Sequence, residues 1–208
     1  MLVGQENKQL SEVELLPPTI KRKVFERIGL QIRQIASTPL DRALNPWQLA
    51  PLVKLKVVDI NYLSQLSLEA RSILLKENSK DWSGATTMPL PNGWRLVFIN
   101  PKHSPERQRA TLMEEVSHTV LRHTPSLITP TSTEGEKSRF RDFNRAQEEA
   151  AYGVGTAALI PYYVLRLSVE RGISASRIAQ KFGVSEDLAL FRIKVCRLWE
   201  TYKNLTKD

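Results

Sequence analysis

Two adjacent glutamates and a nearby histidine are the residues whose types and spacing best suit chemistry: Glu114, Glu115 and His118. They lie in the segment Arg107–His123, which reads R-Q-R-A-T-L-M-E-E-V-S-H-T-V-L-R-H. On a helix, Glu114 and His118 are neighbours on successive turns. Such a pair can offer two ligands to one metal ion, with Glu115 beside the attacking water as a general base. A solvated helix face with an ordinary Glu–His pair would show the same pattern.

The segment that follows Ser104 must be helical for these groups to converge. Ser104 is a suitable N-cap, Pro105 suits the first helical position, and Glu106 favours the positive end of the helix dipole. At about 100° per residue, apolar side chains share one face: Leu112, Met113, Val116 and Val120. Glu114 and His118 fall on roughly the opposite side. We therefore expect the apolar face to be buried and the polar groups to border a site.

A second inner helix, predicted over Arg145–Leu159, is the natural source of a third ligand. Glu148 and Glu149 lie near its start, where acidic residues also favour the helix dipole, so both interpretations stay open. Gly153 and Gly155 each cost about 1 kcal/mol of helix propensity relative to alanine. A helix with two such glycines needs a close neighbour, and we expect that neighbour to be the Glu114 helix.

The remaining elements are predicted from periodicity and turn residues. An amphipathic helix is predicted over Ile20–Ile35, where branched residues recur at spacings of four and three: Val24, Ile28, Ile32 and Ile35. Further predictions are a helical turn at Pro46–Ala50, a strand over Leu55–Ile60, a helix over Ser67–Lys76 and a loop over Thr124–Lys137. Residues 1 to about 16 are expected to be weakly ordered.

A hairpin signal precedes the Glu114 helix. Asn92–Gly93 favours a tight turn with positive φ, and the residues from Trp94 to Asn100 have strong β-propensity. At a sheet edge, this strand would offer unpaired N–H and C=O groups to an extended peptide. The alternative is a central strand that is buried on both faces.

The C-terminal forty-odd residues predict a helix-turn-helix-like unit. A helix over Ser176–Phe182 is followed by Gly183 and Ser185, and then by a second helix from Glu186 to Trp199. Acidic residues in the first turn of that second helix would repel DNA phosphates. Basic residues further along could touch only the DNA backbone: Arg192, Lys194 and Arg197. Nucleic acid is therefore an unlikely partner, and a structural or partner-binding role is favoured.

The composition is that of a soluble globular protein. The chain has 208 residues, 41% hydrophobic and 25% charged, enough for one domain or one domain with a small appendage. We expect neither a signal peptide nor a membrane span, since the first residues include several charges. One cysteine, Cys196, excludes an internal disulfide, fits a cytoplasmic location, and is expected to be a small buried residue. The net charge is +8, and the basic residues that produce it are spread along the chain.

Taken in order, these features resemble the ImmA/IrrE family of metallopeptidases over roughly residues 20 to 195. The matching motifs are Trp82-Ser83-Gly84, Ile99-Asn100-Pro101, the Arg107–His123 helix, Glu148-x-x-Ala151 and Ala158-Leu159-Ile160-Pro161, with the closing helical unit. The resemblance implies a zincin-like core with H-E-x-x-H on one helix and a glutamate ligand on a later helix. Many such proteins cut, or promote the cutting of, repressors that control mobile elements or stress responses.

Carried over by position, the resemblance makes His118 a metal ligand, Glu115 the general base and Glu148 the third ligand. Glu149 fits the spacing less well. The family's first histidine is Glu114 here, which can still reach a metal. A metal held by two anionic ligands should acidify its bound water less than a metal in a more electropositive zinc site. The two carboxylates should also favour harder ions such as manganese. Without metal, the carboxylates should repel one another, and at least one should hold its proton.

The other histidines are poorer candidates. His123 should point about 140° away from His118 unless the helix has ended, and the position of His103 cannot be predicted.

The sequence thus predicts an α+β fold: a mainly helical, zincin-like core with a small β-sheet over residues 1–165, and a helix-turn-helix-like segment over residues 166–208. The predicted function is a metal-dependent endopeptidase that uses zinc or manganese to cut a protein substrate such as a transcriptional repressor. One alternative is a catalytically inactive relative that serves as a regulatory protein-binding module. A less favoured one is a DNA-binding regulator.

Overall fold

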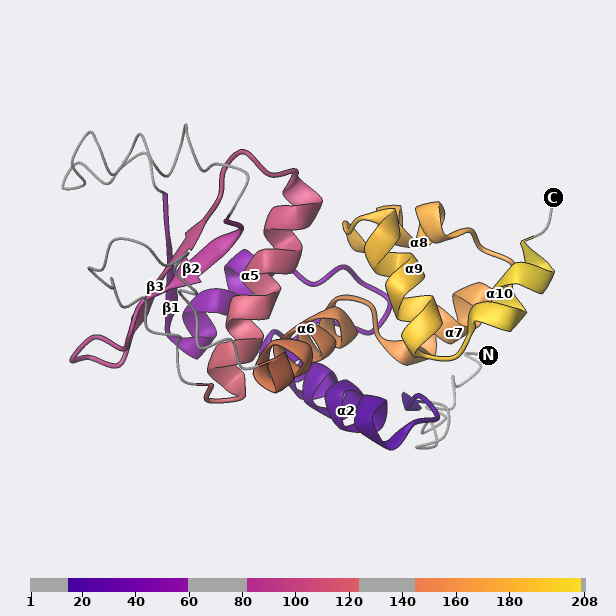
Figure 1. Cartoon of the computed structure of the whole chain (residues 1–208), viewed down its shortest axis with the longest axis horizontal. Coiled ribbons are helices and arrows are strands. Elements are labelled where there is room, and N and C mark those ends of the chain that lie inside the picture. The colour runs from indigo at the N-terminus through magenta and orange to yellow at the C-terminus, as the bar shows by residue number, and fades with distance from the viewer. Residues whose placement is uncertain (1–14, 60–81, 124–144, 207–208) are drawn as a thin grey trace, which may run out of the picture.

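The computed structural model describes residues 15–59, 82–123 and 145–206. It confirms a mainly helical α+β fold with a small mixed sheet (Figure 1). The sheet lies at one end of the molecule and the C-terminal helices at the other, with α2 (Ile20–Ile35) and α6 (Arg145–Leu159) between them. The predicted helix over Ser67–Lys76 and the predicted loop over Thr124–Lys137 fall outside the described residues, as do residues 1–14.

The sheet has the strand order β1-β3-β2. β1 (Leu55–Val58) is parallel to β3 (Arg95–Ile99), and β2 (Gly84–Thr86) is antiparallel to it. The predicted turn joins β2 to β3: the N–H of Gly93 donates to the carbonyl of Leu90 at 2.8 Å, and Gly93 has a φ of 78°. A residue with a side chain rarely adopts that φ, which explains the glycine.

The strand predicted over Trp94–Asn100 is central, so the possibility that it forms a sheet edge is wrong. β3 is flanked by β1 on one side and β2 on the other, which uses its main-chain groups on both sides. Val97 and Ile99 point to the buried face. Among the described strands, β2 is the edge strand nearest the helix that carries the two glutamates.

That helix is α5 (Pro105–Val120), and it begins as predicted. The Ser104 hydroxyl accepts a hydrogen bond from the Arg107 N–H at 3.3 Å, and the apolar side chains Leu112, Met113 and Val116 are fully buried. α5 lies close to β2 because Gly84 has no side chain: a Cβ there would be 2.6 Å from Cγ2 of Thr111. The glycine therefore permits the sheet to approach the helix.

Small residues of α6 let it pack against two helices. A Cβ on Gly155 would lie 3.2 Å from Oγ of Ser117 on α5, and a Cβ on Gly153 would clash with the Phe25 ring on α2. From the α2 side, a Cβ on Gly29 would lie 2.9 Å from the backbone N of Ala158. The expected close contact with α5 is confirmed, and α2 is a second close neighbour.

α2 has its predicted ends, but its buried face coincides only in part with the predicted apolar stripe. Val24 and Ile35 are 45% and 48% exposed, whereas Phe25 and Ile32 are buried. The buried face also contains Glu26 and Arg33, at 0% and 1% exposure. The predicted apolar stripe is therefore only partly right: Ile32 is in the core and Ile28 packs against it, but the two internal charged residues shift the buried face away from Val24 and Ile35.

The C-terminal region contains four helices: α7 (Tyr162–Glu170), α8 (Ala175–Phe182), α9 (Glu186–Val195) and α10 (Trp199–Leu205). The helix-turn-helix-like geometry of α8 and α9 is confirmed, with Gly183 at a φ of 65° and the Ser185 hydroxyl capping α9. The prediction of one helix from Glu186 to Trp199 is wrong, because the chain turns at Arg197, which has a φ of 59°. α7 was not predicted.

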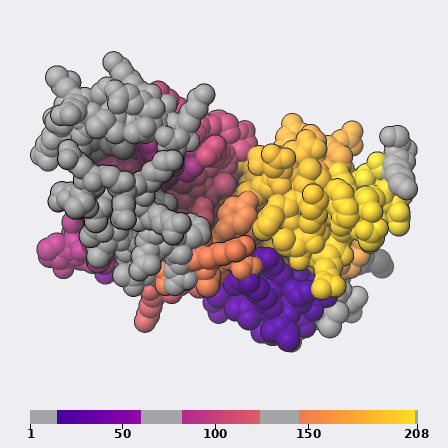
Figure 2. Space-filling view, viewed as in Figure 1, coloured from indigo at the N-terminus to yellow at the C-terminus, as the bar shows by residue number. Residues whose placement is uncertain are grey.

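A buried ion pair joins α2 to α9. Oε2 of Glu26 lies 2.7 Å from the Arg192 guanidinium, and Oε1 accepts a hydrogen bond from the N–H of Tyr162 at 2.6 Å. Arg192 also donates to the carbonyl of Ile160 at 2.9 Å. Burial raises the pKa of Glu26, although the charge of Arg192 opposes that effect. Figure 2 shows the C-terminal helices as a lobe lying against α2.

Several other sequence predictions can be compared with the structure. Cys196 is buried, as expected. Within the described part of the chain, no helix has the length and apolar character needed to cross a membrane. The division of the chain into a domain over residues 1–165 and a segment over residues 166–208 stays a prediction.

Before β1, the chain forms the short helix α3 (Pro46–Leu49) and a 3-10 turn, η1 (Ala50–Val53). These elements lie close to the helical turn predicted over Pro46–Ala50.

Candidate metal centre

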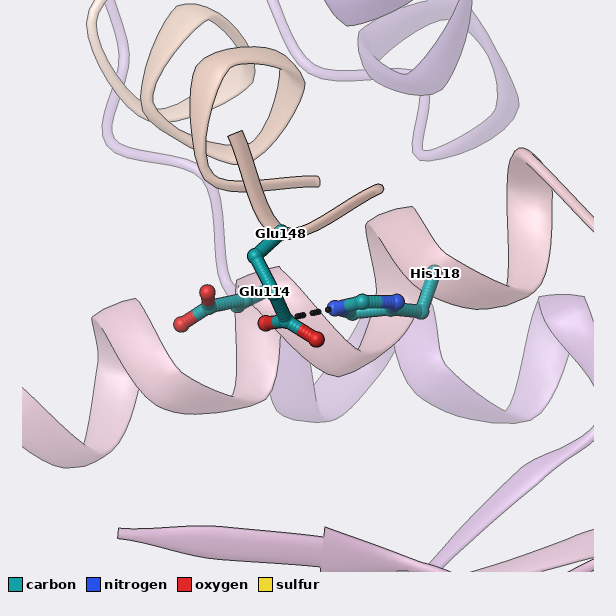
Figure 3. Close-up of side chains that lie close together, drawn as sticks. All are labelled: Glu114, His118 and Glu148. Atoms are coloured by element: carbon teal, nitrogen blue, oxygen red, sulfur yellow. Dashed lines mark ion pairs between the residues drawn. The ribbon is translucent and has the colours of Figure 1, made fainter. Parts of the chain in front are cut away.

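The structure brings Glu114, His118 and Glu148 together (Figure 3). One potential ligand atom from each residue lies within 4.8 Å of those from the other two. Nε2 of His118 is 3.5 Å from Oε2 of Glu148. Glu114 and His118 lie on successive turns of α5, and Glu148 reaches down from α6. These are the three residues that the sequence predicts as metal ligands.

The approach of α6 explains why Glu148 is near α5 and Glu149 is not. Gly155 fits closely against α5 two turns after Glu148, which brings the start of α6 over the cluster. Glu149 points to α2 instead, where its carboxylate lies 2.5 Å from Nζ of Lys21 and 3.6 Å from the Arg22 guanidinium. Glu148 therefore faces His118 on α5, whereas Glu149 pairs with basic residues of α2.

The cluster is rich in negative charge. The pKa of Glu114 is raised from 4.5 to about 7, first by burial and then by the nearby charges of Glu115 and Glu148. This agrees with the expectation that one of the converging carboxyls holds its proton. A divalent cation would stabilise this carboxyl, because it would replace the proton of Glu114 and offset the repulsion between the carboxylates.

Glu115 lies beside the cluster and contacts the sheet. The hydroxyl of Thr86 on β2 donates a hydrogen bond to Oε2 of Glu115 at 2.6 Å. Thr86 has no motif of its own, so sequence reasoning missed it. The predicted hairpin gave a weak signal for Thr86, because a residue on the strand before the turn can face the helix that follows the hairpin.

His123 is much closer to His118 than the spacing predicts. α5 ends at Val120, and Arg122 adopts a φ of 56°, so the His123 N–H donates to the His118 carbonyl at 2.9 Å. The two Nδ1 atoms are then 3.1 Å apart, with the rings edge to face. Burial lowers the pKa of His123. Glycine usually occupies the left-handed position at such a helix end. Because Arg122 occupies it here, the sequence did not predict where the helix ends.

His103 stays outside the cluster. It precedes α5, and its carbonyl accepts a hydrogen bond from Nε2 of Gln108 at 2.8 Å. Its position is about three turns before Glu114.

Comparison with protein families agrees with this geometry. The model of the IrrE N-terminal-like domain, a peptidase family designated M78, matches residues 68–194, more than half of the 208 residues. The chain belongs to this family. The match runs through α5, α6 and α9, and it confirms the resemblance to ImmA/IrrE metallopeptidases. Comparisons with curated proteins and with solved structures gave no match.

Within this metallopeptidase-type family, the donor set of the chain fits a divalent cation. Two carboxylates and one imidazole are suitable ligands, and their separation allows one ion to touch all three. The chain departs from the H-E-x-x-H pattern only in its first residue, where Glu114 supplies oxygen in place of nitrogen. The pKa of Glu114 is raised first by burial and then by the charges of Glu115 and Glu148, and a bound cation would offset both effects.

Proposed function

We propose that the chain is a metal-dependent endopeptidase, with Glu114, His118 and Glu148 as ligands and Glu115 as general base. The observation that carries the proposal is the convergence of the three ligand atoms within 4.8 Å. Glu115 lies beside them and accepts a hydrogen bond from Thr86 on β2. Membership of a peptidase family supports it.

The residues of the chain have separable roles in such a reaction. When bound, the cation would supply Lewis acidity to polarise the scissile carbonyl and acidify water. Glu115 would take a proton from the attacking water and pass it to the leaving amine. The Thr86 hydroxyl donates to Oε2 of Glu115, which leaves Oε1 for the water. A Cβ on Gly84 would lie 3.4 Å from that Oε1, so the glycine keeps the base accessible.

A peptide substrate has a suitable strand to pair with in β2. β2 is an edge strand among those described, and Thr86 belongs to it. An extended peptide that added to this edge would run beside Glu115, with main-chain hydrogen bonds providing much of its affinity. This role replaces the one first considered for the strand from Trp94 to Asn100.

The family suggests a substrate class. We infer a protein substrate such as a transcriptional repressor, in control of a mobile element or a stress response. For the cation we favour manganese at least as much as zinc, because two of the three ligands are carboxylates.

A catalytically inactive relative remains the second candidate, and the replacement of the first histidine by Glu114 favours it. Such a protein would use the same fold as a protein-binding module. The DNA-binding alternative has less support, because Arg192, one of its three basic candidates on α9, is buried against Glu26.

Metal content is the first test, measured on untagged wild-type protein and on His118→Ala after incubation with zinc or manganese. Stoichiometric metal in the wild type alone supports the proposal. Absence of metal from both proteins favours the inactive relative.

Catalysis is tested separately. Glu115→Gln should abolish cleavage of a repressor substrate while metal content stays nearly unchanged. Cleavage retained by this variant would remove Glu115 from the role of base.

A further inference from the structure

The end of α5 forms a motif that places one histidine against another. The N–H of Arg122 donates to the carbonyl of Thr119 at 3.1 Å, and the N–H of His123 donates to the carbonyl of His118 at 2.9 Å. With Arg122 in the left-handed conformation, this is the hydrogen-bond pattern of a Schellman helix end. In that motif the residue after the left-handed one packs over the residue five positions earlier. Here those two residues are His123 and His118.

The contact joins the edge of the His118 ring that faces away from the carboxylates. Nδ1 of His118 is 3.1 Å from Nδ1 of His123, whereas its Nε2 is the atom near Glu148. His123 is therefore not a ligand to a cation held at Nε2, since the His118 ring stands between them. Its ring is half-buried and edge to face with that of His118, with centroids 5.0 Å apart.

A hydrogen bond between two Nδ1 atoms needs one proton. A neutral imidazole carries its proton on one nitrogen and accepts at the other. If Nε2 of His118 is to bind a cation, the proton of His118 must be on Nδ1, and His123 must accept it. His123 then carries its own proton on Nε2. A single contact thus determines the tautomers of both rings.

We propose that His123 is a positioning residue, whose Nδ1 accepts the Nδ1–H of His118 and so presents Nε2 of His118, unprotonated and correctly oriented, to the cation. This inference rests on the proposed metal centre. It assigns to His123 the role that a carboxylate or a main-chain carbonyl often has beside a metal-binding histidine.

Metal affinity and histidine tautomers test the role independently. The full-length wild type, His123→Phe and His123→Gln would be titrated with zinc and with manganese against a competing chelator. Phenylalanine keeps a ring of similar size but removes the acceptor, so affinity should fall by about 10–100-fold. Glutamine retains an acceptor oxygen, and its affinity should stay much closer to that of the wild type. His103→Phe makes the same substitution outside the cluster and should leave affinity unchanged.

Nitrogen NMR provides the readout that does not depend on a variant folding. The chain has three histidines, so ¹⁵N-histidine labelling gives a simple spectrum. In the zinc-bound wild type, Nδ1 of His118 should carry a proton, and Nδ1 of His123 should carry none.

The possible results are distinct. A proton on Nδ1 of His123 in the zinc complex, or equal affinity of His123→Phe and the wild type, would overturn the positioning role and leave the metal centre intact. Wild-type protein that binds neither ion would refute the metal centre, and the positioning role with it.

Discussion

The raised pKa of Glu114 makes a quantitative prediction for Glu114→Gln in metal-free protein. The carboxyl has a pKa of about 7 in the folded chain against an ordinary value of 4.5. As pH rises, the unfolded chain therefore releases this proton first, while the folded chain keeps it. Stability from this group is fully present below pH 4.5 and is lost as pH rises through about 7.

The size of the effect follows from the same two values. A difference between 4.5 and about 7 corresponds to about 3 kcal/mol of unfolding free energy. Glutamine has nearly the shape of the protonated acid but cannot ionise. We therefore expect Glu114→Gln and the wild type to be similarly stable near pH 5, and the variant to be more stable by up to about 3 kcal/mol near pH 8.

Urea unfolding in the presence of a chelator, repeated at several pH values between about 5 and 8, measures this difference. Glu149→Gln is a matched control, because that exposed carboxylate pairs with Lys21 and its pKa is lowered. The control should not gain stability over the wild type as pH rises. The reasoning is refuted if the wild type and Glu114→Gln show the same pH dependence. Adding manganese or zinc near pH 8 should stabilise the wild type and not Glu114→Gln.

Three further substitutions test the structure around the site. Arg192→Met should cost about 3–5 kcal/mol in urea unfolding, because it leaves the buried Glu26 carboxyl without its partner; adding Glu26→Gln to this variant should recover part of that loss, and no recovery would argue against the pair. Gly29→Ala should destabilise by about 1–3 kcal/mol, since the new Cβ meets the backbone of α6; a gain in stability, as expected for alanine in an open helix, would contradict the close packing. Thr86→Val should slow peptide cleavage by about 10- to 100-fold with metal content unchanged, because a hydrogen bond to a charged group contributes about 1.5–3 kcal/mol; an unaltered cleavage rate would show that the base needs no support from β2.

Local signals predicted much of the fold and the three clustered side chains. Ser104, Ser185 and Gly183 mark helix ends through their own hydrogen bonds or backbone angles, so their effect is readable along the chain. The prediction of Glu148 depended on the spacing of the family motif. Glu149 is a neighbour of the same type, and only the packing of α6 between two helices separates them.

The missed features depend on contacts between distant parts of the chain. The position of β3 is set by its pairing with β1, which no local pattern encodes. The buried face of α2 was predicted only in part, because Glu26 on that face has its partner on α9, far along the sequence. His123 was missed for a different reason. Its position depends on a left-handed arginine, and the conformational cost of that residue is met by the hydrogen bonds of the helix end.

The pair of Glu26 and Arg192 also bears on how the chain unfolds. α2 precedes the segment that matches the family, and α9 closes it, yet their charges are buried against each other. Fraying of the C-terminal helices would expose one charge to water and leave the other in an apolar interior. Loss of α9 is therefore opposed until α2 and α6 also open. α2 and α9 should therefore melt in one transition, and the helices that carry the proposed metal ligands should melt with them.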